Sequence, residues 1–269
     1  MNYMTGLYQN IGPASETYAG FAWNYLRRNI AYAHDFESIL SSDKFDSTLA
    51  QGSIRYEMDV DKEAHRWGLE CFESPLSTGL DALVIWRQDA FPGALSVQYH
   101  DELDQDNDAK SFKLSDFDCH KQHYVKADGT RISVIKSAEF WLQISGKPDE
   151  IEGEEQPFSV LIDGGKGARR RIDALRQLTS LSRNGSENFK LLGRQKAFTK
   201  MRNALVAYDI RANGGSYKDV GLALFGAKNV QQNWDSSGGF LKARAIRSCK
   251  FGERMVAQDY QSLLPKKTI

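Results

Sequence analysis

The pattern of apolar positions changes character shortly after the middle of the chain. Up to about residue 163, short apolar runs typical of strands cover residues 82–86, 94–99, 123–126, 131–135, 140–144 and 158–162. From Gly164 onward the strand pattern stops, and apolar residues recur at helical spacing. We therefore predict an α+β fold in which an N-terminal helix and antiparallel strands precede an all-helical C-terminal region.

Two local signals refine the N-terminal part. The aromatic-rich segment 15–36 is amphipathic and is expected to form one helix opened by Ser15 as the N-cap. Asp128-Gly129 separates two strand-like runs and predicts a tight hairpin turn. We divide the chain into an acidic α+β region, residues 1–157, and a basic helical region, residues 158–269.

The basic region contains four predicted helices. The first covers about 168–183, and the other three cover 194–212, 217–225 and about 237–256. Ser216 followed three residues later by Asp219 is a variant of the capping box. A short helix after a Gly turn, followed by a longer basic helix, is the layout of a helix-turn-helix, which we expect within about 194–256.

The last helix separates into two faces at about 100° per residue. One stripe holds small or apolar residues and is expected to face the core: Leu241, Ala245, Ser248, Cys249, Gly252 and Val256. The opposite side carries Arg247, Lys250 and Arg254, with Arg244 beside them. Such a face suits contacts with phosphates and base edges in a major groove.

The charge distribution supports a polyanionic partner. The net charge is zero, but residues 1–157 hold 14 Lys and Arg against 27 Asp and Glu, whereas residues 158–269 hold 21 against 8. Attraction between the two halves is the alternative explanation. The residues expected to contact DNA are Arg244, Arg247, Lys250, Arg254, Lys242, Lys218, Lys228, Arg169, Arg170 and Arg171. The last three could instead pair within the molecule.

Other kinds of site are not favoured. Residues 104–108 open like a calcium loop, but Ala109 and Ser115 replace the Gly and Glu that such a loop needs. Cys119, His120 and His123 lack the spacing of a zinc site. Residues 164–167 lack the spacing of a phosphate-binding loop, and no nucleophile motif is present. We therefore expect that the protein has no catalytic residue, binds no metal or cofactor, and is not an enzyme.

Composition sets the expected compartment. The chain is 41% hydrophobic, has no secretory signal and contains no apolar run near the about 18 residues that cross a membrane. Its three Cys are scattered, as in a reducing environment. We expect a cytoplasmic protein with no membrane partner. Two alternatives remain open: an adaptor or antitoxin-like interaction protein, and an enzyme acting on nucleic acid.

Two stretches resemble a known proteobacterial family. The run SYKDVGLALFGAKNVQQNW and the ending AQDYQSLL are similar to the DNA-binding domain of type VI secretion transcription factors. FAWNYLRRNIAYAHDF is similar to the transcriptional regulator-like segment found with it. The chain departs from the family at Ile30, where Pro is common, and at Gln258 and Asp259, where small residues and Gly are usual.

The resemblance implies a virulence-related activator of a secretion operon, with double-stranded promoter DNA and the transcription machinery as partners. We also expect a homo-oligomer, at least a dimer, because one helix-turn-helix rarely contacts enough DNA for a specific site. Its interface is expected in the aromatic-rich half, which holds Trp23, Trp67, Trp86 and Trp141; the alternative is that these rings fill the core.

Overall fold

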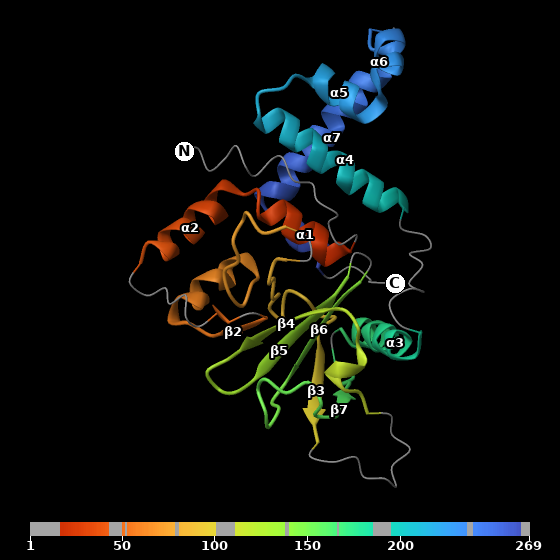
Figure 1. Cartoon of the computed structure of the whole chain (residues 1–269). Coiled ribbons are helices and arrows are strands. Elements are labelled where there is room, and N and C mark those ends of the chain that lie inside the picture. The colour runs from red at the N-terminus through yellow and green to blue at the C-terminus, as the bar shows by residue number, and fades with distance from the viewer. Residues whose placement is uncertain are drawn as a thin grey trace.

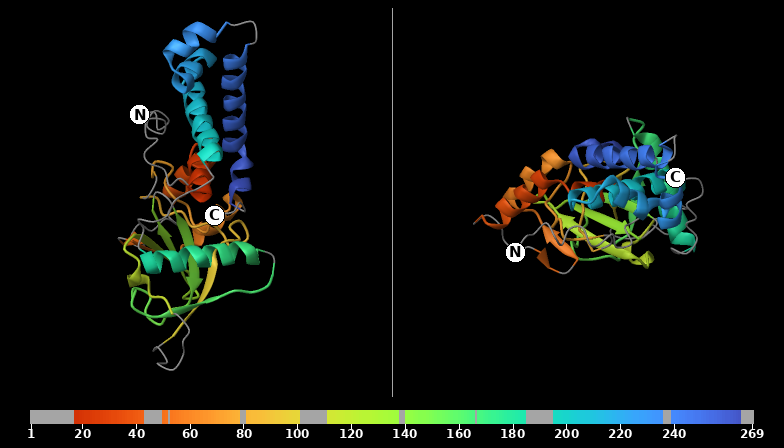
Figure 2. Two further views of the ribbon diagram at one scale, coloured as in Figure 1. Left: turned by 90° about the vertical axis from the view of Figure 1, so that its right-hand side faces the viewer. Right: turned by 90° about the horizontal axis from the view of Figure 1, so that it is seen from above.

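A computed structural model describes residues 17–42, 50–51, 53–78, 81–100, 111–137, 140–165, 167–184, 195–235 and 239–264. Ser15 and the calcium-like residues 104–108 lie outside these ranges. The described chain forms a body, built on one mixed sheet, and a tower of helices that stands on it (Figures 1 and 2). The α+β class is confirmed, with helices gathered toward the C-terminus.

The sheet has seven strands: β1 (Ala50–Gln51), β2 (Ile54–Tyr56), β3 (Leu95–Tyr99), β4 (His120–Val125), β5 (Arg131–Lys136), β6 (Trp141–Gly146) and β7 (Phe158–Leu161). Their order is β1-β2-β4-β5-β6-β3-β7. The expectation of antiparallel strands alone was wrong, because β2 pairs with β4, and β3 with β6, in parallel. Apolar alternation identifies a strand but does not specify its neighbour or direction.

The predicted hairpin is confirmed between β4 and β5. Gly129 adopts φ +81° in the turn, and the Lys126 N–H donates to the Thr130 carbonyl at 2.8 Å. The run 82–86, by contrast, is not a strand and makes only the isolated bridge between Trp86 and Leu69. The amide of Gln143 bonds both the N–H (3.1 Å) and the carbonyl (2.6 Å) of Trp86, so a side chain replaces a neighbouring strand.

The N-terminal helical segment is divided, which corrects the single predicted helix. α1 (Tyr18–Leu26) begins after Thr17, and α2 (Ile30–Leu40) begins after Asn29. The Asn29 side chain accepts hydrogen bonds from the N–H groups of Ala31 and Tyr32 and so starts a new helix. The described residues also include the 3₁₀ helices η3 (Asp59–Trp67), η4 (Leu114–Asp116) and η6 (Asp259–Leu263).

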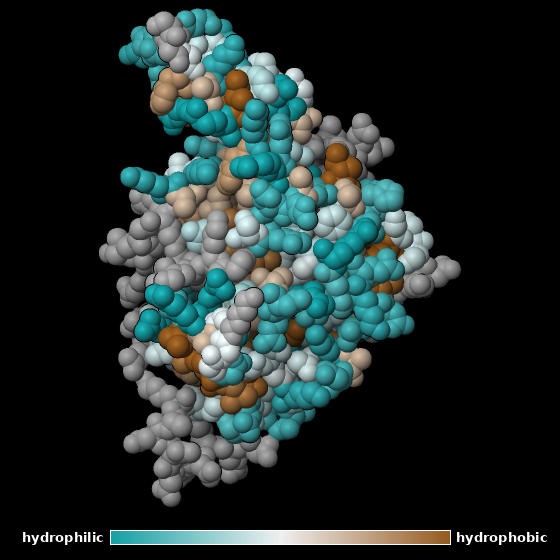
Figure 3. Space-filling view, turned by 180° about the vertical axis from the view of Figure 1, so that it is seen from behind, coloured by the Kyte–Doolittle hydropathy of each residue, from teal (hydrophilic) through white to brown (hydrophobic). Residues whose placement is uncertain are grey.

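α3 (Ala168–Asn184) covers part of the sheet, where Ala174, Leu178 and Leu181 pack with apolar residues of the strands. The boundary expected between residues 157 and 158 therefore falls within the body, since β7 begins at Phe158 and pairs with β3. Figure 3 shows that the rear surface is mostly hydrophilic, with scattered apolar groups on both the body and the tower. The exposed large apolar side chains at the end of β7 and on α3 are Leu161, Ile162 and Ile172.

The tower contains α4 (Gln195–Ala212), α5 (Tyr217–Phe225), α6 (Ala227–Asn233) and α7 (Phe240–Ala257). The capping box at Ser216 and Asp219 is present as predicted. The short α6 was not predicted. It follows Gly226, whose φ of +80° ends α5 and allows the chain to turn directly into another helix. Val230 is the residue of α6 that is buried in the tower core.

The largest core joins the body to the tower, since residues of α1 and η6 pack with the lower parts of α4 and α7. Trp23, Trp86 and Trp141 are buried in the body at 1% exposure or less. These three rings fill the core of one chain, so they are not available as the interface between copies that the sequence suggested.

Candidate nucleic-acid interface

The two predicted faces of α7 are present in the tower. Leu241, Ala245, Cys249, Gly252 and Val256 are buried, as expected, whereas Ser248 is half-buried at the edge of the stripe. The close approach of α7 to α4 requires Gly252, because a Cβ atom there would lie 2.5 Å from the Ala204 carbonyl oxygen. The buried stripe therefore fixes which side of α7 faces outward.

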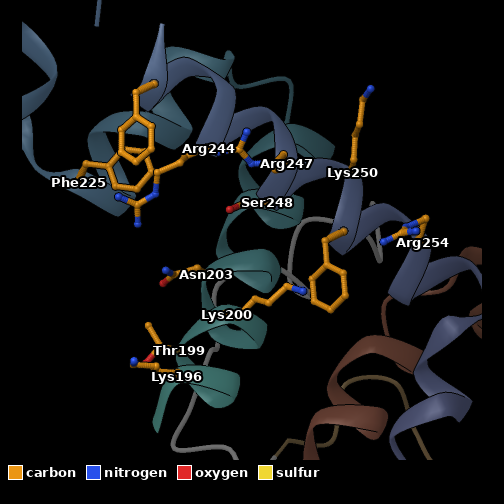
Figure 4. Close-up of a pocket in the computed structure, with 12 residues that line it drawn as sticks. Lys196, Thr199, Lys200, Asn203, Phe225, Arg244, Arg247, Ser248, Lys250 and Arg254 are labelled. Atoms are coloured by element: carbon orange, nitrogen blue, oxygen red, sulfur yellow. The ribbon is translucent and has the colours of Figure 1, made fainter. Parts of the chain in front are cut away.

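A groove of about 870 Å³ runs between α4 and α7 on that outward side. Figure 4 shows its lining side chains projecting from both helices. Six are cationic: Lys196 and Lys200 from α4, and Arg244, Arg247, Lys250 and Arg254 from α7. Thr199, Asn203 and Ser248 add polar groups, and the apolar part of the lining is Phe225, Phe240 and Phe251.

The cations of the groove are not neutralised within the described part of the chain. None of the six forms an ion pair with a described carboxylate. Instead, the Lys200 ammonium lies 4.2 Å from the centre of the Phe251 ring. Because an unpaired cation in a hollow attracts counterions, this groove is a candidate site for a polyanion.

Arg244 lies beside two aromatic rings. Its guanidinium carbon lies 4.7 Å from the centre of the Phe225 ring and 5.5 Å from the centre of the Phe240 ring. Phe225 ends α5, and Phe240 begins α7, so two elements bring rings to one side chain at the end of the groove (Figure 4). Stacking of this kind holds the planar group in place.

The sequence reasoning missed the wall that α4 contributes. Lys196, Lys200 and Asn203 line the groove opposite α7. The signal was available, because two Lys four residues apart share one face of a helix. Which neighbouring helix this face lies against depends on tertiary packing, and the sequence pattern of the 194–212 segment does not contain that information.

The other predicted contact residues lie apart from the groove. Lys242, Lys218 and Lys228 are exposed on α7, α5 and α6, respectively, and do not line it. Arg169, Arg170 and Arg171 lie on α3, on the body. Arg170 and Arg171 line a second hollow with Arg87, Asp89 and Gln261, among others.

Of these three arginines, Arg171 has an intramolecular role. Its side chain is largely buried and forms an ion pair with Asp163 at 2.5 Å. It also donates to the Asp163 carbonyl at 3.2 Å. Arg169 remains exposed. The structure therefore does not bring the α3 arginines together with the basic face of α7.

His123, one of the potential metal ligands in the sequence, has partners within the body. The His123 ring bonds the Ser133 hydroxyl at 2.8 Å and approaches Glu154 at 3.4 Å, and burial lowers its pKa. Within the described ranges, no three His, Cys, Asp or Glu side chains are grouped to hold a metal ion. The same ranges contain no helix that is long and apolar enough to span a membrane.

Comparison with known protein families agrees with this geometry. Residues 161–265, which include the whole tower, match the family model described as the T6SS transcription factor DNA-binding domain. Residues 13–72 match the proteobacterial transcriptional regulator-like domain. No curated protein matches the chain.

The two matches, together with the groove, define the class of protein as a DNA-binding transcriptional regulator. The C-terminal part of the chain is similar to the DNA-binding domain of type VI secretion transcription factors and the N-terminal part to the regulator-like domain, so the resemblance found in the sequence is confirmed.

Proposed function

We propose that this regulator binds double-stranded promoter DNA sequence-specifically, with α7 as the recognition helix of a helix-turn-helix whose first helix is α5. The observation that carries this proposal is the row of cations on α7 that form no ion pair with a described carboxylate, Arg244, Arg247, Lys250 and Arg254, within the segment that matches a DNA-binding domain. The capped, Gly-terminated α5 packs against α7 and would supply the first helix of the motif, with the short α6 between them.

The dimensions of α7 suit a major groove. The row from Arg244 to Arg254 extends over about 15 Å of helix axis. A helix with side chains is about 10–12 Å wide, which matches the about 12 Å width of the groove. Lys196 and Lys200 on α4 then face one phosphate strand beside the recognition helix. Lys218 and Lys228 are candidate contacts to the phosphates on the other side.

We further propose that the protein acts in the cytoplasm as an activator of a type VI secretion operon, without enzymatic activity or a cofactor. Two half-sites one helical turn apart would engage a homo-oligomer. Because Trp23, Trp86 and Trp141 are buried, the exposed apolar side chains Leu161, Ile162 and Ile172 are the better candidates for the contact between copies. These roles agree with the family, whose matched domain is that of a transcription factor.

The first prediction concerns the salt dependence of DNA binding. If about five phosphates are neutralised, the logarithm of the association constant should fall with the logarithm of the salt concentration at a slope of about −4.5. A mobility-shift titration of genomic promoter fragments across a range of salt concentrations measures this slope. The triple variant R247E/K250E/R254E should lose binding, because its recognition face would repel phosphate.

The matched control is Lys62→Glu, which changes an exposed lysine of η3 on the body. It should leave both the affinity and the slope nearly unchanged. Absence of binding at low salt, or binding whose strength does not depend on salt, would contradict the proposal and favour a protein-interaction role. Equal binding by the triple variant would show that DNA contacts another surface.

A further inference from the structure

The cations of the groove differ in how firmly they are held. Arg247, Lys250 and Arg254 project from α7 without a ring beside them among the described aromatic contacts, whereas Arg244 lies against both Phe225 and Phe240. A phosphate contact tolerates a mobile cation because the charge attracts from many directions. Reading a base requires the donor atoms to be placed accurately.

The stacking leaves the hydrogen-bonding edge of Arg244 available. The guanidinium carbon lies over both rings, and these ring contacts do not use the N–H donors of the group as conventional hydrogen bonds would. No ion pair with a described carboxylate consumes these donors, and the residue is exposed. A guanidinium whose position is fixed can donate two parallel hydrogen bonds, which matches the O6 and N7 acceptors that guanine presents in the major groove.

The position of Arg244 agrees with this role. It lies one turn after Phe240, the first residue of α7, and the N-terminal residues of a recognition helix are those that reach base edges. Phe240 itself is 60% exposed, so it lies at the surface beside the Arg244 guanidinium. Arg254 lies in the last turn of α7, toward the body.

We propose that Arg244 is the specificity-determining residue, that it reads one guanine through N7 and O6, and that Phe225 and Phe240 are positioning residues that hold its guanidinium for this contact. The remaining cations of the groove then serve as phosphate contacts. This inference rests on the proposed DNA-binding function. It adds that the recognition helix selects a guanine and names the residue that reads it.

The experiment uses the full chain and a duplex selected from a random-sequence library by the wild-type protein. Each guanine of that duplex is replaced in turn by 7-deazaguanine, which lacks only the N7 acceptor. Wild-type protein should lose about tenfold in affinity at one guanine. Arg244→Lys keeps the charge but not the fork, and its affinity should change less than about twofold at the same guanine.

Two further measurements separate base reading from other roles. The salt slope of Arg244→Lys should equal that of the wild type, because the number of cations is unchanged. Phe240→Tyr keeps a ring and should keep the sensitivity to 7-deazaguanine, whereas Phe240→Ala should reduce it. Arg254→Lys is the matched control and should behave as the wild type at that guanine. Circular dichroism melts verify that each variant is folded.

The outcomes are distinguishable. If the wild-type protein selects no duplex from the random-sequence library, both this inference and the proposed function are refuted. If the protein selects a duplex but no single guanine is sensitive, or if Arg244→Lys remains as sensitive as the wild type, DNA binding stands and the role of Arg244 is refuted. Equal sensitivity in Phe240→Ala would refute the positioning role of the ring alone.

Discussion

Lys136 in the middle of the sheet shows how strongly a single residue can depend on its surroundings. Its side chain is fully buried, its ammonium donates to the Ala82 carbonyl, and it lies 5.2 Å from the centre of the Trp141 ring. Burial lowers its pKa to about 8, although Glu73 and Asp81 act in the opposite direction. The folded protein therefore holds this lysine less readily in its charged form than the unfolded chain does.

We predict a distinct pH dependence from this residue. Between a pH of about 8 and 10.5, the unfolded chain retains a proton that folded Lys136 has lost, so its contribution to stability rises with pH. Compared with Lys136→Met, the free energy of unfolding of the wild type should increase by about 3 kcal/mol across this window. Urea unfolding at a series of pH values measures the difference.

Lys147→Met provides the control for Lys136, since Lys147 is 63% exposed in its side chain. Its substitution should leave the pH dependence of the wild type unchanged. A difference between wild type and Lys136→Met that stays constant with pH would contradict the prediction.

Individual residues differed in how far the sequence alone could place them. Helical geometry was sufficient to predict the two faces of α7, because the spacing of residues within one helix determines which side chains lie on the same face. The lysines of α4 entered the same site only through the packing of two helices that are distant in the sequence. For Lys136, the strand was predicted, but its burial beside Ala82 depends on long-range packing that periodicity does not contain.

At the level of elements, α1 is joined to α4 and α7 by polar contacts as well as by the core. The Arg28 guanidinium binds the Asp209 carboxylate through two hydrogen bonds of 2.7 and 2.9 Å, both groups being buried. The Tyr25 hydroxyl donates to the Met201 carbonyl at 2.8 Å. The Asn29 amide donates to the carbonyls at the end of α7, at Val256 and Ala257.

Removing one partner of the Arg28–Asp209 pair should be costly. Asp209→Ala leaves a buried guanidinium without its counter-charge, and we predict a loss of about 3–5 kcal/mol in the free energy of unfolding. The double variant R28M/D209L should recover much of this loss because no charge remains buried. Urea unfolding midpoints and slopes test both expectations.

The exposed pair Arg87–Asp89 offers a comparison, since its side chains are 31% and 70% exposed. Asp89→Ala should change stability by less than about 1 kcal/mol. If Asp209→Ala were as mild as Asp89→Ala, the buried pair would not be a significant link between the elements.

The sequence predicted most elements but not all of their limits. The β4–β5 hairpin and α5 were found because their turn and capping residues act locally. The break at Asn29 was missed because the apolar pattern continues across it, and the direct turn at Gly226 hid the short α6. Residues 82–86 have strand-like composition, but the Gln143 side chain takes the place of a neighbouring strand.

Across the whole molecule, one core connects the body and the tower. Tyr260, which follows α7, stacks near Trp86 with ring centres 6.4 Å apart and donates a hydrogen bond to the Trp67 carbonyl. Phe198 of α4 contacts the rings of Tyr18 and Phe21 of α1. The lower end of the tower is therefore continuous with the interior of the body.

We predict that body and tower unfold in one transition. Tryptophan fluorescence reports mainly on the body, where Trp23, Trp86 and Trp141 are buried, whereas far-UV circular dichroism is weighted toward the helices of the tower. The two signals should give coincident urea curves, and Asp209→Ala should shift both together. Separate midpoints, with helical signal lost first, would show that the tower opens independently.

The contacts of Arg28 and Asn29 bear on how such regulators can diversify. Both residues belong to the segment that matches one family model, while Asp209, Val256 and Ala257 belong to the segment that matches the other. A recombination event that exchanged only one segment would preserve these contacts only if the incoming segment carried matching partners for the interior charge and for the helix end. Exchange of a single segment is therefore constrained by these contacts, whereas substitutions at the outer end of α7 leave them unchanged.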